Sequence, residues 1–266
     1  MPKYTATNPD KKYHGLAIFF LTLLGMLFYP AYPDMMSLKW TLRMAAVMLI
    51  IMFFVVRFVR RATNQERLFD RRFTWSSKAM QLSVIAIVLV YLVMYVVNGN
   101  VECLGKIAHL SANKMASCVF VALGAGVFEE YLVRGYFFNL FQRIFNRYDV
   151  KKHRLLYVSF VTSLLFGCLH FTNFGQGPNE AIFQQVFYAT CFGLLFAAIR
   201  ILSNTIWAGA ILHFLFDLQD SINDDLVADS WGNVLLMFVP VAIIAVIVIV
   251  LADKKVQSEG VQELEA

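Results

Sequence analysis

Three apolar stretches of the sequence each carry side chains that can accept or donate a proton. Glu129 lies in the run Phe-Glu-Glu-Tyr-Leu-Val-Arg-Gly, His170 ends the run Phe-Gly-Cys-Leu-His, and the run His-Phe-Leu-Phe-Asp extends from His213 to Asp217. Peptide hydrolysis needs a base for water, hydrogen-bond donors for the oxyanion and an acid for the leaving amine. Imidazole and carboxyl groups can meet these needs near neutral pH if the three stretches meet in space.

The first stretch also contains an ion pair at helical spacing. Glu130 and Arg134 are four residues apart, so on a helix they share a face and can neutralise each other. Glu129 lies about 100° around the helix from Glu130 and must find its partner on another helix or in water. Because a Glu–Arg pair at this spacing is more often structural than catalytic, we expect Glu130 and Arg134 to support the site.

Each of these residues, taken singly, has a simpler explanation. A lone His in an apolar helix is often a hydrogen-bond partner for a neighbouring helix. The combination of Glu129, His170 and His213 on three separate stretches favours a catalytic site. Cys168 lies two residues before His170, and such residues do not face each other on a helix. The sequence therefore favours direct attack by water over attack by a cysteine or serine.

A metal ion is the alternative way of activating water. Glu129, His170, His213 and Asp217 could all serve as zinc ligands. However, the sequence has no His-Glu-x-x-His run or other compact zinc motif. We therefore favour a site without a cofactor, with zinc as the alternative.

The elements that must position these residues are membrane-spanning helices. Of the 266 residues, 59% are hydrophobic and only 15% are charged, whereas a soluble chain carries about 25% charged residues. A helical span needs about 20 mostly apolar residues. We predict an all-α, polytopic integral membrane protein with about eight such segments, at residues 15–32, 40–56, 79–97, 115–140, 155–171, 182–199, 205–218 and 234–252.

The loops between these segments predict their orientation. Most of the basic residues lie in 1–14, 57–78, 141–154 and the chain after 252, whereas the loop at 219–232 is acidic. By the positive-inside rule, both termini are cytoplasmic. We predict cytoplasmic tails at 1–14 and 253–266 and an eight-helix membrane domain at 15–252, with its catalytic core at about 115–218. The net charge of +5 is explained by this topology, so we expect no nucleic-acid partner.

The motifs, in chain order, resemble those of a known family. Glu-Glu-x-x-x-Arg from Glu129, Phe-x-x-x-His ending at His170 and His-x-x-x-Asp from His213 are similar to the motifs of the CPBP family. This family, also called Abi, contains the CAAX proteases and the bacteriocin-processing enzymes. The resemblance covers about residues 115–217, and the eight-span topology is also similar to that of the Ras-converting CAAX endopeptidases.

The resemblance implies a role for each matching residue. It implies that Glu129 and His170 activate the attacking water and that His213 stabilises the oxyanion, with Glu130 and Arg134 in support. It also implies a glutamate-type intramembrane protease rather than a metalloprotease. Asp217 departs from the pattern, because the family often has Asn at this position. An ionised Asp cannot donate a hydrogen bond to an oxyanion, so either Asp217 is protonated or, as we prefer, it orients His213.

The resemblance further implies a multi-pass protein of the cell membrane, or of the endoplasmic reticulum in a eukaryote. Its partners would be membrane lipid and a peptide or protein substrate, which could be prenylated, a bacteriocin or a pheromone. Two alternatives stay open. One is a non-enzymatic membrane protein that gives bacteriocin immunity or binds a partner. The other is a proton-coupled transporter, since buried Glu and His residues also form proton relays.

Overall fold

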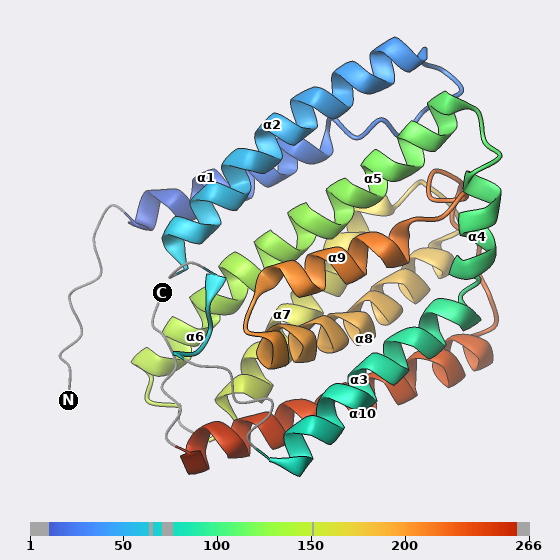
Figure 1. Ribbon diagram of the computed structural model, residues 1–266. Helices are drawn as coiled ribbons and strands as arrows, with labels where there is room; N and C mark the ends of the chain where they lie inside the picture. The colour runs from blue at the N-terminus through green and yellow to red at the C-terminus, as the bar shows by residue number, and fades with distance from the viewer. Residues whose placement is uncertain (1–10, 64–65, 71–76, 151, 260–266) are drawn as a thin grey trace.

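The chain folds into a bundle of helices, as the apolar segments predict. The computed structural model describes residues 11–63, 66–70, 77–150 and 152–259, and no strand occurs among them. Figure 1 shows the long helices side by side along one direction. They are α1 (Lys11–Met26), α2 (Leu38–Ala62), α3 (Lys78–Val97), α4 (Asn100–Ile107), α5 (Ala112–Glu130), η2 (Tyr131–Phe137), α6 (Phe138–Arg147), α7 (Arg154–Leu169), η3 (His170–Asn173), α8 (Asn179–Ser203), α9 (Ile206–Asp217) and α10 (Trp231–Glu259).

Six of these helical stretches are long and apolar enough to cross a membrane. The apolar parts of α1 and α9, Gly15–Met26 and Ile206–Asp217, are shorter. At 1.5 Å per residue, α9 is about 18 Å long, against about 30 Å for the hydrocarbon core of a bilayer. The structure therefore confirms an all-helical fold with six candidate membrane-spanning helices among the described residues, and the count of eight stays a prediction.

The helix ends agree with the predicted sides of the loops. The C-terminal ends of α2, α6, α8 and α10 lie together at one end of the bundle, and the connections that follow α1, α3, α7 and α9 lie at the other (Figure 1). Part of the predicted basic loop, most of the predicted N-terminal tail and half of the predicted C-terminal tail fall outside the described residues. Which end faces the cytoplasm stays a prediction.

Several helix ends differ from the predicted spans, and α2 and α10 continue to Ala62 and Glu259, past the predicted ends at residues 56 and 252. The first helix ends at Met26 instead of continuing to Tyr32, because the chain turns there and Pro30 and Pro33 follow. The short helix α4 occupies part of a connection that the sequence suggested was a loop. The segment 27–37 between α1 and α2 therefore forms turns beside the bundle rather than the end of a span.

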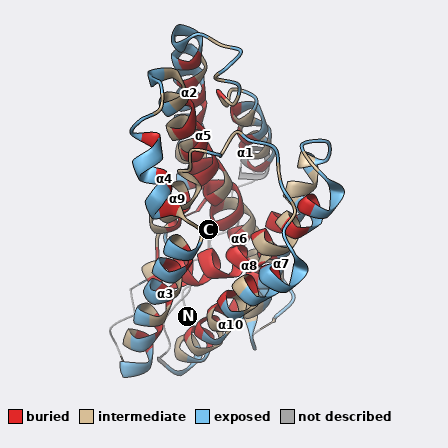
Figure 2. Cartoon of the chain, turned by 90° about the vertical axis from the view of Figure 1, so that its right-hand side faces the viewer, coloured by how far each residue is buried: buried red, intermediate tan, exposed pale blue. Residues whose placement is uncertain are grey.

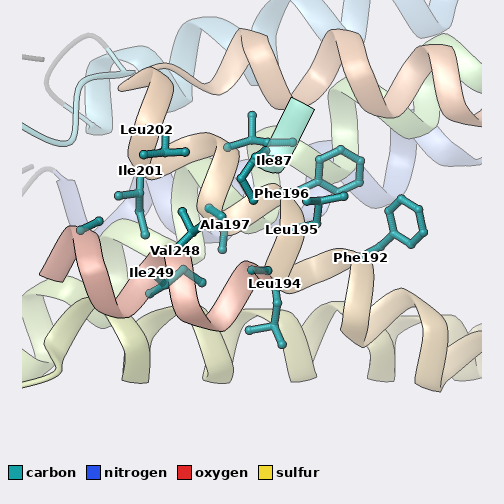
Figure 3. Close-up of a cluster of buried hydrophobic side chains, with 14 of the residues drawn as sticks. Ile87, Phe192, Leu194, Leu195, Phe196, Ala197, Ile201, Leu202, Val248 and Ile249 are labelled. Atoms are coloured by element: carbon teal, nitrogen blue, oxygen red, sulfur yellow. The ribbon is translucent and has the colours of Figure 1, made fainter. Parts of the chain in front are cut away.

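The interior is organised around α5, η2 and α8. In the most apolar windows of the α5–α6 stretch and of α8, 72% of residues are buried, against 28% for α2 and α3. Figure 2 shows this contrast between buried central helices and exposed outer ones. Figure 3 shows Phe192, Leu195 and Phe196 of α8 in one apolar cluster, together with Val248 of α10 and Ile87 of α3. The candidate residues thus lie on central helices, and the outer helices present apolar surface to lipid.

Candidate active site

Glu129 and Glu130 end α5 at the point where the helix widens. The next seven residues, Tyr131–Phe137, form a π-helical turn that leads without a break into α6. π-Helical turns are rare and occur frequently at functional sites. The Glu130 side chain is fully buried, whereas the Glu129 side chain is 18% exposed. Of the two carboxylates, Glu129 is therefore the one that a substrate can reach.

Arg134 holds the buried carboxylate of Glu130 and ties three helices together. Its guanidinium lies 3.0 Å from Glu130 Oε1, as the four-residue spacing predicted. It also donates a 3.1 Å hydrogen bond to the Gly193 carbonyl of α8 and lies 4.4 Å from the ring centroid of Phe166 on α7. Cation–π contact and the ion pair together compensate a charge that is otherwise costly to bury. The Glu130–Arg134 pair therefore holds the helices around the candidate site together.

His213 of α9 lies among three carboxylates. Its Nδ1 is 3.3 Å from Glu130 Oε1, and its Nε2 is 3.3 Å from Asp217 Oδ2 and 3.7 Å from Glu129 Oε2. Its ring also stacks on Phe196 of α8, at a centroid distance of 4.8 Å and an angle of 21°. Because carboxylates accept hydrogen bonds, each ring nitrogen can donate to one. Glu130 and Asp217 thus fix the orientation of the His213 imidazole from both sides.

Two glycines allow α9 to approach α5 closely enough for these contacts. A Cβ atom on Gly126 would lie 2.6 Å from the backbone nitrogen of Phe214. A Cβ atom on Gly209 would lie 2.8 Å from Glu130 Oε2. Such small residues let helix backbones come together in a membrane. The position of His213 therefore depends on the lack of a side chain at Gly126 and at Gly209.

The alanine variant Gly126→Ala is expected to separate α5 from α9. The added carbon would meet backbone atoms that cannot swing away, and overpacking of this kind costs about 1–3 kcal/mol. We expect a lower thermal midpoint and a weaker activity, both measured on purified protein in detergent. Gly105→Ala in α4 is the matched control, because no atom lies within 4 Å of its added Cβ. An unchanged midpoint in Gly126→Ala would contradict the importance of this contact.

His170 follows the last residue of α7, begins η3 and has one ring nitrogen engaged. Its Nδ1 lies 3.0 Å from the Phe166 carbonyl oxygen, and a carbonyl can only accept a hydrogen bond. This contact places the proton on Nδ1 and leaves the Nε2 lone pair to take a proton. The Phe166 ring meets His170 edge-on at 5.0 Å and His213 at 5.9 Å, so it lies against both imidazoles.

The structure thus brings the predicted residues of α5, α7 and α9 together. It adds contacts that the sequence did not indicate, namely the Glu130–His213 contact and the stacking of Phe196 on His213. Phe166 belongs to the Phe-x-x-x-His motif, and its four-residue spacing from His170 was the one signal for its contact. No sequence pattern pointed to Phe196 or Gly209.

The alternative of zinc ligation by Glu129, His170, His213 and Asp217 can be compared with the positions of these side chains. Within the described ranges, no group of three His, Cys, Asp or Glu side chains could hold a metal ion. Both nitrogens of His213 face carboxylates instead of converging with His170 on one point.

Comparison with known proteins agrees with the motifs. Residues 111–219 match the family model described as type II CAAX prenyl endopeptidase Rce1-like. The matched segment runs from the residue before α5 to just beyond α9 and contains all six candidate residues. No curated protein and no solved structure matches the chain. The match confirms the family resemblance and implies a membrane endopeptidase.

Proposed function

Starting from this resemblance to the type II CAAX prenyl endopeptidases, we propose that the protein is an intramembrane endopeptidase that hydrolyses its substrate with an activated water molecule. One observation carries the proposal. Glu129, the more accessible carboxylate of α5, lies 3.7 Å from His213, and the Phe166 ring lies against both His213 and His170, whose Nδ1 contacts the Phe166 carbonyl. A base, a second imidazole and a partly open position therefore occur together inside an apolar bundle.

In the proposed reaction, Glu129, with the help of His170, takes a proton from water as the water oxygen attacks the carbonyl carbon of the substrate. The carbonyl π electrons move to oxygen and form a tetrahedral oxyanion. The proton then passes to the leaving amine as the carbon–nitrogen bond breaks, so the same group acts first as base and then as acid. Water is divided between the two products, with oxygen and one hydrogen on the acid and the other hydrogen on the amine.

Asp217 has a different task from the Asn that often occupies its position in the family. Its carboxylate lies 3.3 Å from His213 Nε2 on the same face of α9. We assign to Asp217 the role of orienting the His213 imidazole, as carboxylates do in other hydrolases. Glu130 has the equivalent task at Nδ1.

The substrate proposed here is a membrane-associated peptide or protein. The family match favours a prenylated C-terminal peptide, and bacteriocin or pheromone maturation is the other form of the same chemistry. The apolar outer faces of α2, α3 and α10 are suited to lipid, and a lipid-bearing peptide could reach the site from the bilayer.

The test uses the purified full chain in detergent and a panel of prenylated and unprenylated peptides, with and without a chelator. We expect cleavage of at least one peptide at an internal bond, with the same rate after chelation. The absence of cleavage across the panel would contradict the protease proposal and favour a binding or immunity role. Cleavage that a chelator abolishes and zinc restores would contradict the metal-free mechanism alone.

A further inference from the structure

Tyr29 lies beside the candidate site although it is far outside the segment that matches the family. It belongs to the turns at 27–37, which run next to the N-terminal half of α5 (Figure 1). Its ring stacks on Phe128 at 6.3 Å, and a Cβ atom on Gly124 would lie 2.5 Å from Tyr29 Cε1. The ring therefore rests on the face of α5 that ends one residue before Glu129.

Hydrogen bonds hold this segment close to the chain that follows Asp217. The Ser117 hydroxyl of α5 donates to the Pro30 carbonyl and accepts a 2.9 Å hydrogen bond from the Asn223 side chain. Asn223 lies in the loop after α9. Pro30, which follows Tyr29, and Asn223, in the loop after α9, thus both hydrogen-bond to Ser117.

Among the described residues, the Tyr29 hydroxyl is one of two buried hydroxyls without a hydrogen-bond partner, the other being that of Ser163 on α7. By contrast, the Tyr91 hydroxyl donates to the Leu212 carbonyl at 2.7 Å and the Tyr131 hydroxyl to Glu66 at 2.8 Å. An unsatisfied buried hydroxyl is destabilising, and a catalytic role is one of the few reasons to keep one.

We propose that Tyr29 donates a hydrogen bond from its hydroxyl to the oxyanion that forms when water attacks the substrate. This inference rests on the proposed function. The Asp217 carboxylate cannot donate, and it already engages His213 Nε2 at 3.3 Å. A neutral tyrosine hydroxyl supplies the donor that Asn gives elsewhere in the family. The oxygen gains negative charge as the carbonyl π bond opens, and the phenol keeps its proton throughout.

Tyr29 is partly exposed as a residue although its hydroxyl oxygen is buried, and it lies in the connection between α1 and α2 rather than in a helix. Hydrogen bonds in catalytic sites are often long in the free enzyme and tighten when substrate binds. Tyr29 would then act on the transition state more than on the bound substrate. Its removal should lower kcat while KM changes little.

The test compares Tyr29→Phe with the wild-type chain on a cleaved peptide. Loss of one oxyanion donor lowers kcat by about 10²–10³-fold, and we expect a loss in this range. Because the hydroxyl has no partner in the free protein, the thermal midpoint should stay the same or rise. Tyr148→Phe is the matched control, since Tyr148 is 74% exposed at the end of α6 and both quantities should stay unchanged.

Two results for Tyr29→Phe would overturn the inference. One is a kcat within about threefold of wild type. The other is a loss of rate that comes with a clearly lower thermal midpoint, which would show a structural role. If the wild-type chain cleaves and Glu129→Gln does not, the proposed function survives either result. If the wild-type chain cleaves no peptide in the panel, the proposed function and this inference fail together.

Discussion

Replacement of Glu129 by glutamine is expected to remove almost all cleavage. Glutamine has the same shape but cannot take a proton from water, and general acid–base catalysis contributes about 10²–10⁴-fold to rate. The contacts among Glu130, Arg134 and His213 do not involve Glu129, so the fold should be retained. The measurement is kcat/KM on a cleaved peptide, together with the thermal midpoint of the purified variant.

Glu102→Gln is the matched control for this experiment. Glu102 is an exposed glutamate on α4, and its replacement makes the same chemical change away from the site. We expect wild-type activity and stability from this control. If Glu129→Gln cleaved as fast as Glu102→Gln, Glu129 would not be the base. That result would indicate that His170, whose Nδ1 contacts the Phe166 carbonyl, activates the water.

The helical architecture was predictable because apolar segments of the length of a bilayer have few other ways to satisfy their backbone. The π-helical turn at Tyr131–Phe137 was not, because its sequence carries no proline or other local signal that differs from an ordinary helix. The end of α1 at Met26 was missed although Pro30 follows it, since the apolar run continues past that residue. Hydrophobicity indicates burial in lipid or protein and does not fix where a helix stops.

The candidate site was predictable only where its contacts are local. The four-residue spacing of Glu130 and Arg134, and that of His213 and Asp217, predicted pairs that the structure contains. The contact between Glu130 and His213 depends on how α5 and α9 cross, which is decided by close packing at Gly126. Tertiary packing of this kind leaves no pattern in a single sequence. The catalytic roles themselves stay predictions.

Replacement of Arg134 by alanine is expected to have the largest effect on stability. Glu130 would lose its cationic partner in a position with no solvent, and breaking a buried ion pair costs about 3–5 kcal/mol. The variant would also lose the contact with the Gly193 carbonyl and the stacking on Phe166. We expect a large fall in the thermal midpoint in detergent and the loss of activity. Arg147→Ala, at the exposed end of α6, should change neither quantity.

A double variant separates the charge from the packing in this prediction. Replacing both Glu130 and Arg134 by leucine leaves no uncompensated charge, and such exchanges are often neutral or stabilising. We therefore expect the double variant to regain much of the stability that Arg134→Ala loses. Activity should not return, because His213 would lack its Nδ1 partner. Recovery of both stability and cleavage would show that Glu130 serves only to neutralise Arg134, and it would remove Glu130 from the positioning of the imidazole.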